Sequence, residues 1–172
     1  MKDTAILDLN HCRRASEVIG LTVWHAYERV GQVTGLVYDT VSLLFCVQVQ
    51  PEQHDTFLVI PVRSLHWHDP QQLSLKDQTT PQPLTEQHLP ARGLPVRVGR
   101  KAKMAFVYDL FIDPQASRIA AFQLMALPGV QQDAHTVQVS GEEVERWAGE
   151  LQISNEVLAQ LTHSLHTPVR VG

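Results

Sequence analysis

The chain has 172 residues and a mass of 19.3 kDa, and its 14 Lys and Arg against 18 Asp and Glu give a net charge of −4. Hydrophobic residues make up 44% of the chain, which excludes wholesale disorder. With only Cys12 and Cys46, a disulfide scaffold and a four-cysteine zinc site are also excluded. The mildly acidic balance excludes a generally basic nucleic-acid coat but leaves a local basic patch open.

The first residues carry no recognisable targeting signal. Asp3 and Asp8 interrupt any apolar core of a signal peptide. The longest apolar run, 43–47, is far shorter than the roughly 18 residues of a membrane span. We therefore expect a cytoplasmic protein without a membrane span and with reduced thiols.

Short alternating segments bounded by turn residues predict β-strands in the first half. One covers 20–24 and opens at a glycine, a second ends in the Val-Tyr-Asp triplet at 37–39, and a third covers 41–50. The polar residues 51–55 predict a turn after the third strand.

The middle of the chain is rich in proline. Five of the ten prolines lie from Pro70 to Pro95, and the segment 76–85 is polar without an apolar period. Because proline fixes φ and removes a hydrogen-bond donor, neither a helix nor a central strand suits this segment. We expect a linker over 76–92.

The second half repeats the pattern of the first. The triplet at 37–39 recurs at 107–109, and residues 56–67 align with 136–147 without a gap, each ending in Trp. Further strands are expected at 93–98 and 118–125. A type I turn is expected at 113–116, just before the second of these strands. Closing each half into a small barrel would remove the bare sheet edges.

These motifs resemble the PRC-barrel family, a small β-barrel shared by the photosynthetic reaction-centre H subunit and a ribosome-maturation factor. The first half carries the segment 15–23, the Gly-x-Val-x-Gly-x-Val-x-Asp hairpin at 31–39, and the Ile60-Pro61 step. In the second half Lys101 and Ala105 stand where the pattern has glycines, and Ser140-Gly141 replaces Ile-Pro.

The resemblance implies a mainly β fold of two small antiparallel PRC-type β-barrels in tandem, with C-terminal helices. The expected organisation is a first barrel at 13–75, a linker at 76–92, a second barrel at 93–153, and a helix and tail at 154–172. The family resembles a reusable binding module, so the resemblance implies a fold and not a reaction.

The tail changes from a β pattern to a helical one. Ser140 and Glu143 have capping-box spacing, and the helical spacing of the apolar residues after them predicts a helix over 142–151. A second helix is expected from an N-cap at Ser154, ending at Pro168. Its apolar stripe consists of Val157, Leu158, Leu161 and Leu165. That stripe either packs on its own domain or forms a protein interface.

The sequence predicts no catalytic residue and no cofactor. It has no Gly-x-Ser-x-Gly elbow and no phosphate-binding loop. Cys46 lies in an apolar strand and is expected in the core, and nothing local marks Cys12 as activated. The paired Tyr-Asp steps at 38–39 and 108–109 could act as acid–base groups, but their repetition favours a structural role in which each Asp sets a turn.

The nine histidines suggest either a pH sensor or metal binder, or a scattered polar surface. His66 and His68 share one face of a strand, and His163 and His166 share one face of a helix. Two ligands fall short of the three or four that zinc requires, so no metal site is predicted.

One cluster of basic residues interrupts the acidic chain. It contains Arg92, Arg97, Arg100, Lys101 and Lys103, with no acidic residue among them. The last four lie on the expected first hairpin of the second barrel and could hold the phosphates of RNA. The alternative is an ordinary solvated hairpin, because no aromatic residues interleave with the charges.

Three functions from different classes remain open. The first is a non-enzymatic PRC-barrel adaptor that acts through a protein partner or self-association. The second is an RNA-binding protein of ribosome assembly or RNA processing. The third is an enzyme with a cryptic small-molecule site.

Overall fold

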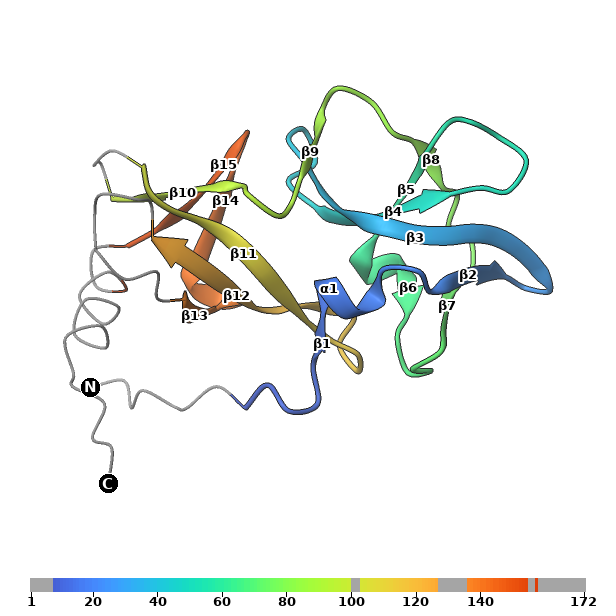
Figure 1. Ribbon diagram of the computed structural model, residues 1–172, viewed down its shortest axis with the longest axis horizontal. Helices are drawn as coiled ribbons and strands as arrows, with labels where there is room; N and C mark the ends of the chain where they lie inside the picture. The colour runs from blue at the N-terminus through green and yellow to red at the C-terminus, as the bar shows by residue number, and fades with distance from the viewer. Residues whose placement is uncertain (1–7, 100–102, 127–135, 155–156, 158–172) are drawn as a thin grey trace.

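The computed structural model describes residues 8–99, 103–126, 136–154 and 157 (Figure 1). The protein is mainly β, and its strands form two sheets, one built mostly from each half of the chain. This confirms the expected fold class at its coarser level.

The first sheet has the strand order β6-β7-β2-β3-β4-β5-β8, and β9 pairs with β3. The strands are β2 (Thr22–His25), β3 (Glu28–Asp39), β4 (Phe45–Gln50), β5 (Leu58–Pro61), β6 (Leu65–His66), β7 (Gln72–Leu75), β8 (Gln82–Pro83) and β9 (His88–Pro90). A short 3-10 helix, η1 (Val62–Ser64), joins β5 to β6.

The second sheet has the strand order β13-β12-β11-β10-β15-β14, and β1 pairs with β11. The strands are β1 (Arg13–Arg14), β10 (Pro95–Val98), β11 (Lys103–Asp113), β12 (Arg118–Ala126), β13 (Thr136–Ser140), β14 (Val144–Trp147) and β15 (Glu150–Ile153). The helix α1 (Ala15–Val18) follows β1, and the 3-10 helix η2 (Gly141–Glu143) joins β13 to β14.

The two sheets share one topology, to which the first sheet adds the edge strand β8. Each has a long central hairpin, a short 3-10 connection, and a final strand that pairs in parallel with the first strand, β7 with β2 and β15 with β10. The predicted duplication is therefore present. The expected antiparallel barrels are not confirmed, because both sheets are mixed and, over the residues that the structure describes, neither closes into a barrel.

The duplication has a different register from the one that the sequence indicates. Asp39 caps the β3–β4 turn, accepting bonds from the N–H groups of Val41 and Ser42 at 2.9 and 3.2 Å. Its counterpart in the β11–β12 turn is Asp113, which accepts hydrogen bonds from the N–H groups of Gln115 and Ala116 in the same way. The alignment of Asp39 with Asp109 is therefore wrong by four residues.

Backbone irregularities confirm the corrected register. The β3–β4 ladder shifts between Val33 and Gly35, and the β11–β12 ladder shifts between Val107 and Asp109. A bulge changes the direction of a strand at one defined residue. Since the shifts fall just before Gly35 and just before Asp109, these two residues are counterparts. The Val-Tyr-Asp triplets at 37–39 and 107–109 are therefore identical in sequence but occupy different places in the two repeats.

Glycines at the entry of each repeat follow the same register. Gly20 has φ +93° and donates its N–H to the carbonyl of Val33 at 2.8 Å. Gly93 has φ +90° and donates to the carbonyl of Val107 at 2.7 Å. A residue with a Cβ is strained at such a φ, which explains why both repeats open with glycine.

The proline-rich segment 76–92 runs along the first sheet. Its strand β8 pairs with β5, and its strand β9 pairs with β3. Pro83 and Pro90 lie in these short added strands, where a missing N–H is tolerated. The expected linker therefore also completes one edge of the first sheet.

The tail differs from its prediction. Residues 144–153 form a β-hairpin, β14 and β15, in place of the expected helix. Ser140 does accept a bond from the N–H of Glu142, but the turn that it caps is the 3-10 helix η2. Gly149, at φ +87°, reverses the chain, and β15 gains a parallel partner in β10 that no local pattern reveals.

Most of the second predicted helix, including Leu158, Leu161, Leu165 and Pro168, lies outside the described residues. Ser154 accepts a hydrogen bond from the N–H of Val157 at 3.3 Å, the predicted capping contact. Val157 is buried and belongs to the core.

The leading segments of the two repeats are exchanged. β1 precedes the first repeat but pairs with β11 of the second, while β9 precedes the second repeat but pairs with β3 of the first. Each long hairpin is thus extended by a strand from the other half. The exchange relates the two halves by an approximate two-fold symmetry.

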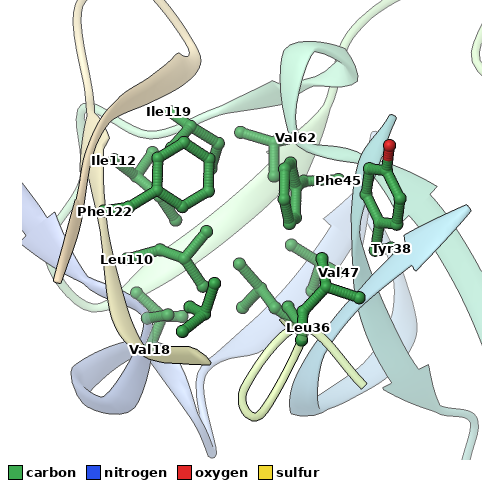
Figure 2. Close-up of a cluster of buried hydrophobic side chains, with 14 of the residues drawn as sticks. Val18, Leu36, Tyr38, Phe45, Val47, Val62, Leu110, Ile112, Ile119 and Phe122 are labelled. Carbon is green, nitrogen blue, oxygen red and sulfur yellow. The ribbon is translucent and has the colours of Figure 1, made fainter. Parts of the chain in front are cut away.

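One hydrophobic core spans both halves. Figure 2 shows Phe45 and Val62 of the first half facing Leu110, Ile119 and Phe122 of the second. The rings of Phe45 and Phe122 lie 5.4 Å apart. A sheet of some 60 residues buries too little surface for high stability alone, and joining the two cores removes that limitation.

Candidate functional sites at the two joints

The approximate symmetry creates two equivalent contacts between the repeats. In each, the turn of one long hairpin lies against the last two strands of the other repeat. The first contact joins the β3–β4 turn to the β14–β15 hairpin, and the second joins the β11–β12 turn to the segment around β6. We name them the apolar joint (residues 40–44 and 144–150) and the basic joint (residues 113–117 and 65–70 with His11, Arg13 and Lys76).

The apolar joint is held by polar contacts below its surface. The hydroxyl of Tyr38 donates to the carbonyl of Trp147 at 2.7 Å, and Arg146 Nη1 donates to the carbonyl of Leu43 at 3.2 Å. The Arg146 guanidinium also lies over the ring of Phe45, 5.0 Å from its centroid. Burial raises the pKa of Tyr38 and lowers the pKa of Arg146.

The surface of this joint carries large apolar side chains. Val41 is 73% exposed and Trp147 is 52% exposed. Single exposed apolar residues are ordinary, but these two stand on segments that the contacts above bind together. The joint therefore presents apolar side chains from both repeats on a fixed frame.

The basic joint occupies the equivalent place at the other contact. Ser117 donates its hydroxyl to the carbonyl of Leu65 at 3.1 Å. Beside this contact lies an open groove of about 790 Å³. The groove is lined by His11, Arg13, His66, Trp67, His68, Pro70, Lys76, Pro114, Gln115 and Ser117.

The predicted pairing of His66 and His68 is confirmed in part. Their rings lie 5.9 Å apart, at the end of β6 and just after it, while the Trp67 between them is fully buried and donates to the carbonyl of Val62 at 2.9 Å. Within the described segments, no three His, Cys, Asp or Glu side chains are arranged to hold a metal ion. His163 and His166 lie outside those segments.

A cavity of about 290 Å³ brings together Asp39, His88 and Cys46, the residue types of a nucleophilic triad. His88 Nε2 lies 3.6 Å from Asp39 Oδ2, and its Nδ1 accepts from the N–H of Thr85. Cys46 is buried as predicted, and burial raises the pKa of its thiol to about 12. A thiol with this pKa is protonated at neutral pH, so the group favours a structural role.

The two Tyr-Asp steps have different roles. Asp39 sets the turn after its strand, as predicted. Asp109 instead lies inside β11, where it accepts from the hydroxyl of Ser16 at 2.7 Å and from the N–H of Leu110 at 2.9 Å. The prediction that Asp109 sets a turn is therefore wrong, because its strand continues for four more residues to Asp113.

A third cavity, of about 280 Å³, lies between the two repeats. Its walls include Gly35 and its counterpart Asp109, together with the exposed Ile19. Arg92 lies over the ring of Tyr108, 5.0 Å from its centroid. Arg92 thus packs on its own repeat at the margin of this cavity.

The predicted RNA-binding residues are only partly placed. Arg97 lies in β10 with its Nε 3.3 Å from Glu150, so this charge has a carboxylate neighbour. Arg100 and Lys101 lie outside the described residues, and Lys103 begins β11. Of the predicted protein interface, Val157 is buried in the core.

Sequence reasoning missed both joints. Val41 and Trp147 lie more than a hundred residues apart, as do His11 and Gln115, and only the packing of one repeat against the other joins their segments. The paired imidazoles at 66 and 68 were the one local signal for the basic joint, since the spacing alone places them on one face.

Comparisons with known proteins identify no relative. No protein-family model matches the chain, and no curated protein matches its sequence. In the described part of the chain, no helix has the length and apolar content needed to cross a bilayer.

Proposed function

We propose that the protein is a non-enzymatic adaptor of the tandem PRC-barrel type, which binds a protein partner or a second copy of itself through the apolar joint. The observation that carries this proposal is the exposure of Val41 and Trp147 on two segments that Tyr38 and Arg146 hold together. Trp is among the residues most enriched at the energetic centres of protein interfaces.

The frame of the joint suits binding without rearrangement. The bonds from Tyr38 and Arg146 end on backbone carbonyls, so they hold the chain whatever side chain stands at 41 or 147. Partners that are ordered before binding lose less conformational entropy when they associate. Apolar side chains on two backbone segments that are held together in this way are therefore well suited to act as anchors.

The test compares the wild type with the double variant Val41→Ser/Trp147→Ser. Light scattering after size-exclusion chromatography measures self-association, and quantitative affinity purification from the native cell measures bound proteins. We expect the double variant to lose the second copy or the partner, with affinity lowered by about 30-fold or more, since a central anchor contributes about 2 kcal/mol.

Tyr27→Ser is the matched control. Tyr27 is 98% exposed between β2 and β3, away from both joints. Its replacement removes an exposed aromatic ring and should leave binding unchanged. Equal recovery of the same proteins by all three forms, with no self-association in any, would contradict the proposal.

The RNA-binding alternative remains a weaker proposal at residues 97–103. Its one described side chain, Arg97, already has Glu150 as a neighbour. Filter binding of RNA to Arg100→Ala/Lys101→Ala at low and high salt tests it, because phosphate contacts make affinity strongly salt-dependent.

A further inference from the structure

We propose that the basic joint is a binding site for a ligand that carries two or more phosphate groups. This goes beyond the adaptor function, since it concerns the opposite contact between the repeats and a different class of ligand. It also differs from the basic cluster at 92–103, whose described residues contribute nothing to this groove.

Five basic side chains line the groove. They come from three separate segments: His11 and Arg13 before the first repeat, His66 and His68 at its end, and Lys76 after β7. Among the described residues no Asp or Glu lines the groove, although the whole chain carries a net charge of −4. Such a concentration of donors in one concave place favours an anion.

Asp69 and Asp113 adjoin lining residues of the groove in sequence, and the charge of Asp69 acts on Arg13. Asp69 accepts from the N–H of Gln71 at 2.8 Å, and Asp113 accepts from the N–H groups of Gln115 and Ala116 at 2.9 and 3.3 Å. Both carboxylates therefore serve their own turns. None of the ion pairs found among the described residues involves Arg13 or Lys76.

Arg13 supplies an independent indication. Its Nη1 is shielded from solvent and has no hydrogen-bond partner among the described residues. A shielded charged donor without a partner is costly, and burial lowers the pKa of this guanidinium, with the charge of Asp69 opposing the shift. The backbone of Arg13 is meanwhile fixed by pairing with Ile112 of β11.

The donor types and the size of the groove indicate phosphate. A guanidinium matches phosphate oxygens with two parallel N–H bonds, and ammonium and imidazole groups add single donors. A groove of about 790 Å³ with donors on several sides exceeds the needs of one carboxylate. A diphosphate or successive phosphates of a nucleic-acid strand would reach several donors at once.

The experiment measures the binding of two probes to the full chain by titration calorimetry at low salt. The probes are inorganic pyrophosphate and a six-nucleotide single-stranded RNA. We expect Arg13→Gln and Lys76→Gln each to weaken binding by about tenfold, as the loss of one charge-assisted contact predicts. His66→Gln/His68→Gln should weaken it by a similar factor.

Matched variants elsewhere control for net charge and histidine content. Arg29→Gln removes one positive charge from the first sheet, and His25→Gln/His54→Gln removes two exposed imidazoles. These variants should bind both probes as the wild type does. Because Lys76 follows β7 and lies outside the strand pairs, Lys76→Gln keeps the test informative should Arg13→Gln unfold the chain.

The outcomes separate the sources of phosphate. Binding of both probes with mutual competition supports a small diphosphate-type site, and binding of the RNA alone, lost in the same variants, supports a strand. Absence of binding for both probes overturns the proposal. Equal losses in the control variants, or equal binding of a polyglutamate peptide, overturn it as well.

Discussion

At the residue scale, the two turn-capping carboxylates show how local chemistry and tertiary contacts combine. Asp39 and Asp113 each accept bonds from the two N–H groups that follow in the turn. Asp39 alone adds a bond from Gln87 Nε2, at 3.1 Å, and the neighbouring imidazole of His88. The proline-rich segment thus reaches into the first turn.

Asp39 should make the free energy of unfolding depend on pH. Burial raises the pKa of its carboxyl, but the N–H bonds from Val41 and Ser42 and the bond from Gln87 more than offset this, so its pKa is lowered. Because the pKa of Asp39 is lower in the folded chain than in the unfolded chain, where it is about 4, its ionised form stabilises the fold above that pH. This stabilisation is lost as the pH falls through the pKa of the folded state.

The measurement is urea unfolding of the wild type and Asp39→Asn between pH 6 and pH 3. We expect the free energy of unfolding to fall less steeply with acidity in the variant. Asp77→Asn, which removes an exposed carboxylate from a different turn, is the control. Parallel curves for the wild type and Asp39→Asn would contradict this prediction.

At the element scale, α1 is the short helix that fastens the first repeat to the second. Its four residues are too few to be stable alone, and Ala15 and Val18 are buried. The hydroxyl and the N–H of Ser16 both donate to the buried carboxylate of Asp109 in β11. The counterpart of Asp109 in the first repeat, Gly35, has no side chain that could accept an equivalent bond.

Ser16→Ala should therefore destabilise the protein by about 1.5 kcal/mol, the lower range for a hydrogen bond to a charged group. The loss arises because Asp109 Oδ2 keeps its charge but loses its hydroxyl donor. Chemical denaturation measures the change, and Ser16→Thr, which retains a hydroxyl, should restore most of it. Equal stability of Ser16→Ala and the wild type would show that the contact contributes nothing.

The β14–β15 hairpin shows why an element can be misread from its pattern. Val144, Leu151 and Trp147 have helical spacing, and Ser140 with Glu143 resembles a capping box. In the structure Leu151 and Ile153 are buried on one face of a strand that pairs with β10. The open edge of β10 provides a full set of backbone partners, and this non-local gain overrides helical spacing.

At the scale of the whole molecule, the exchanged strands and the shared core make the halves depend on one another. β1 completes the second sheet and β9 completes the first. The core contains residues of both halves without a gap. The chain should therefore unfold as one cooperative unit.

Fragments divided at the loop between β7 and β8 test this dependence. We expect 1–79 and 80–172 to be unfolded separately, since each lacks an exchanged strand and half of the core, and to regain β-structure when mixed. Circular dichroism measures the gain. In the intact chain, Trp147→Phe leaves only the tryptophans of the first half, and their fluorescence should follow the same transition as circular dichroism.

Independent folding of either fragment, or separate transitions by the two probes, would contradict the single cooperative unit. Such a result would mean that the shared core contributes little to the stability of each sheet. The two-state criterion is the coincidence of transitions measured by different probes.

The sequence by itself determined the mainly β character, the duplication and the position of most strands, because period-two alternation and turn residues are local signals. It also placed Cys46 in the interior and His66 beside His68. Only the tertiary structure decided the register of the repeat, the exchange of β1 and β9, the hairpin at 144–153 and the two joints. These features depend on which strand each segment pairs with, and the free energy of that pairing comes from residues far away along the chain.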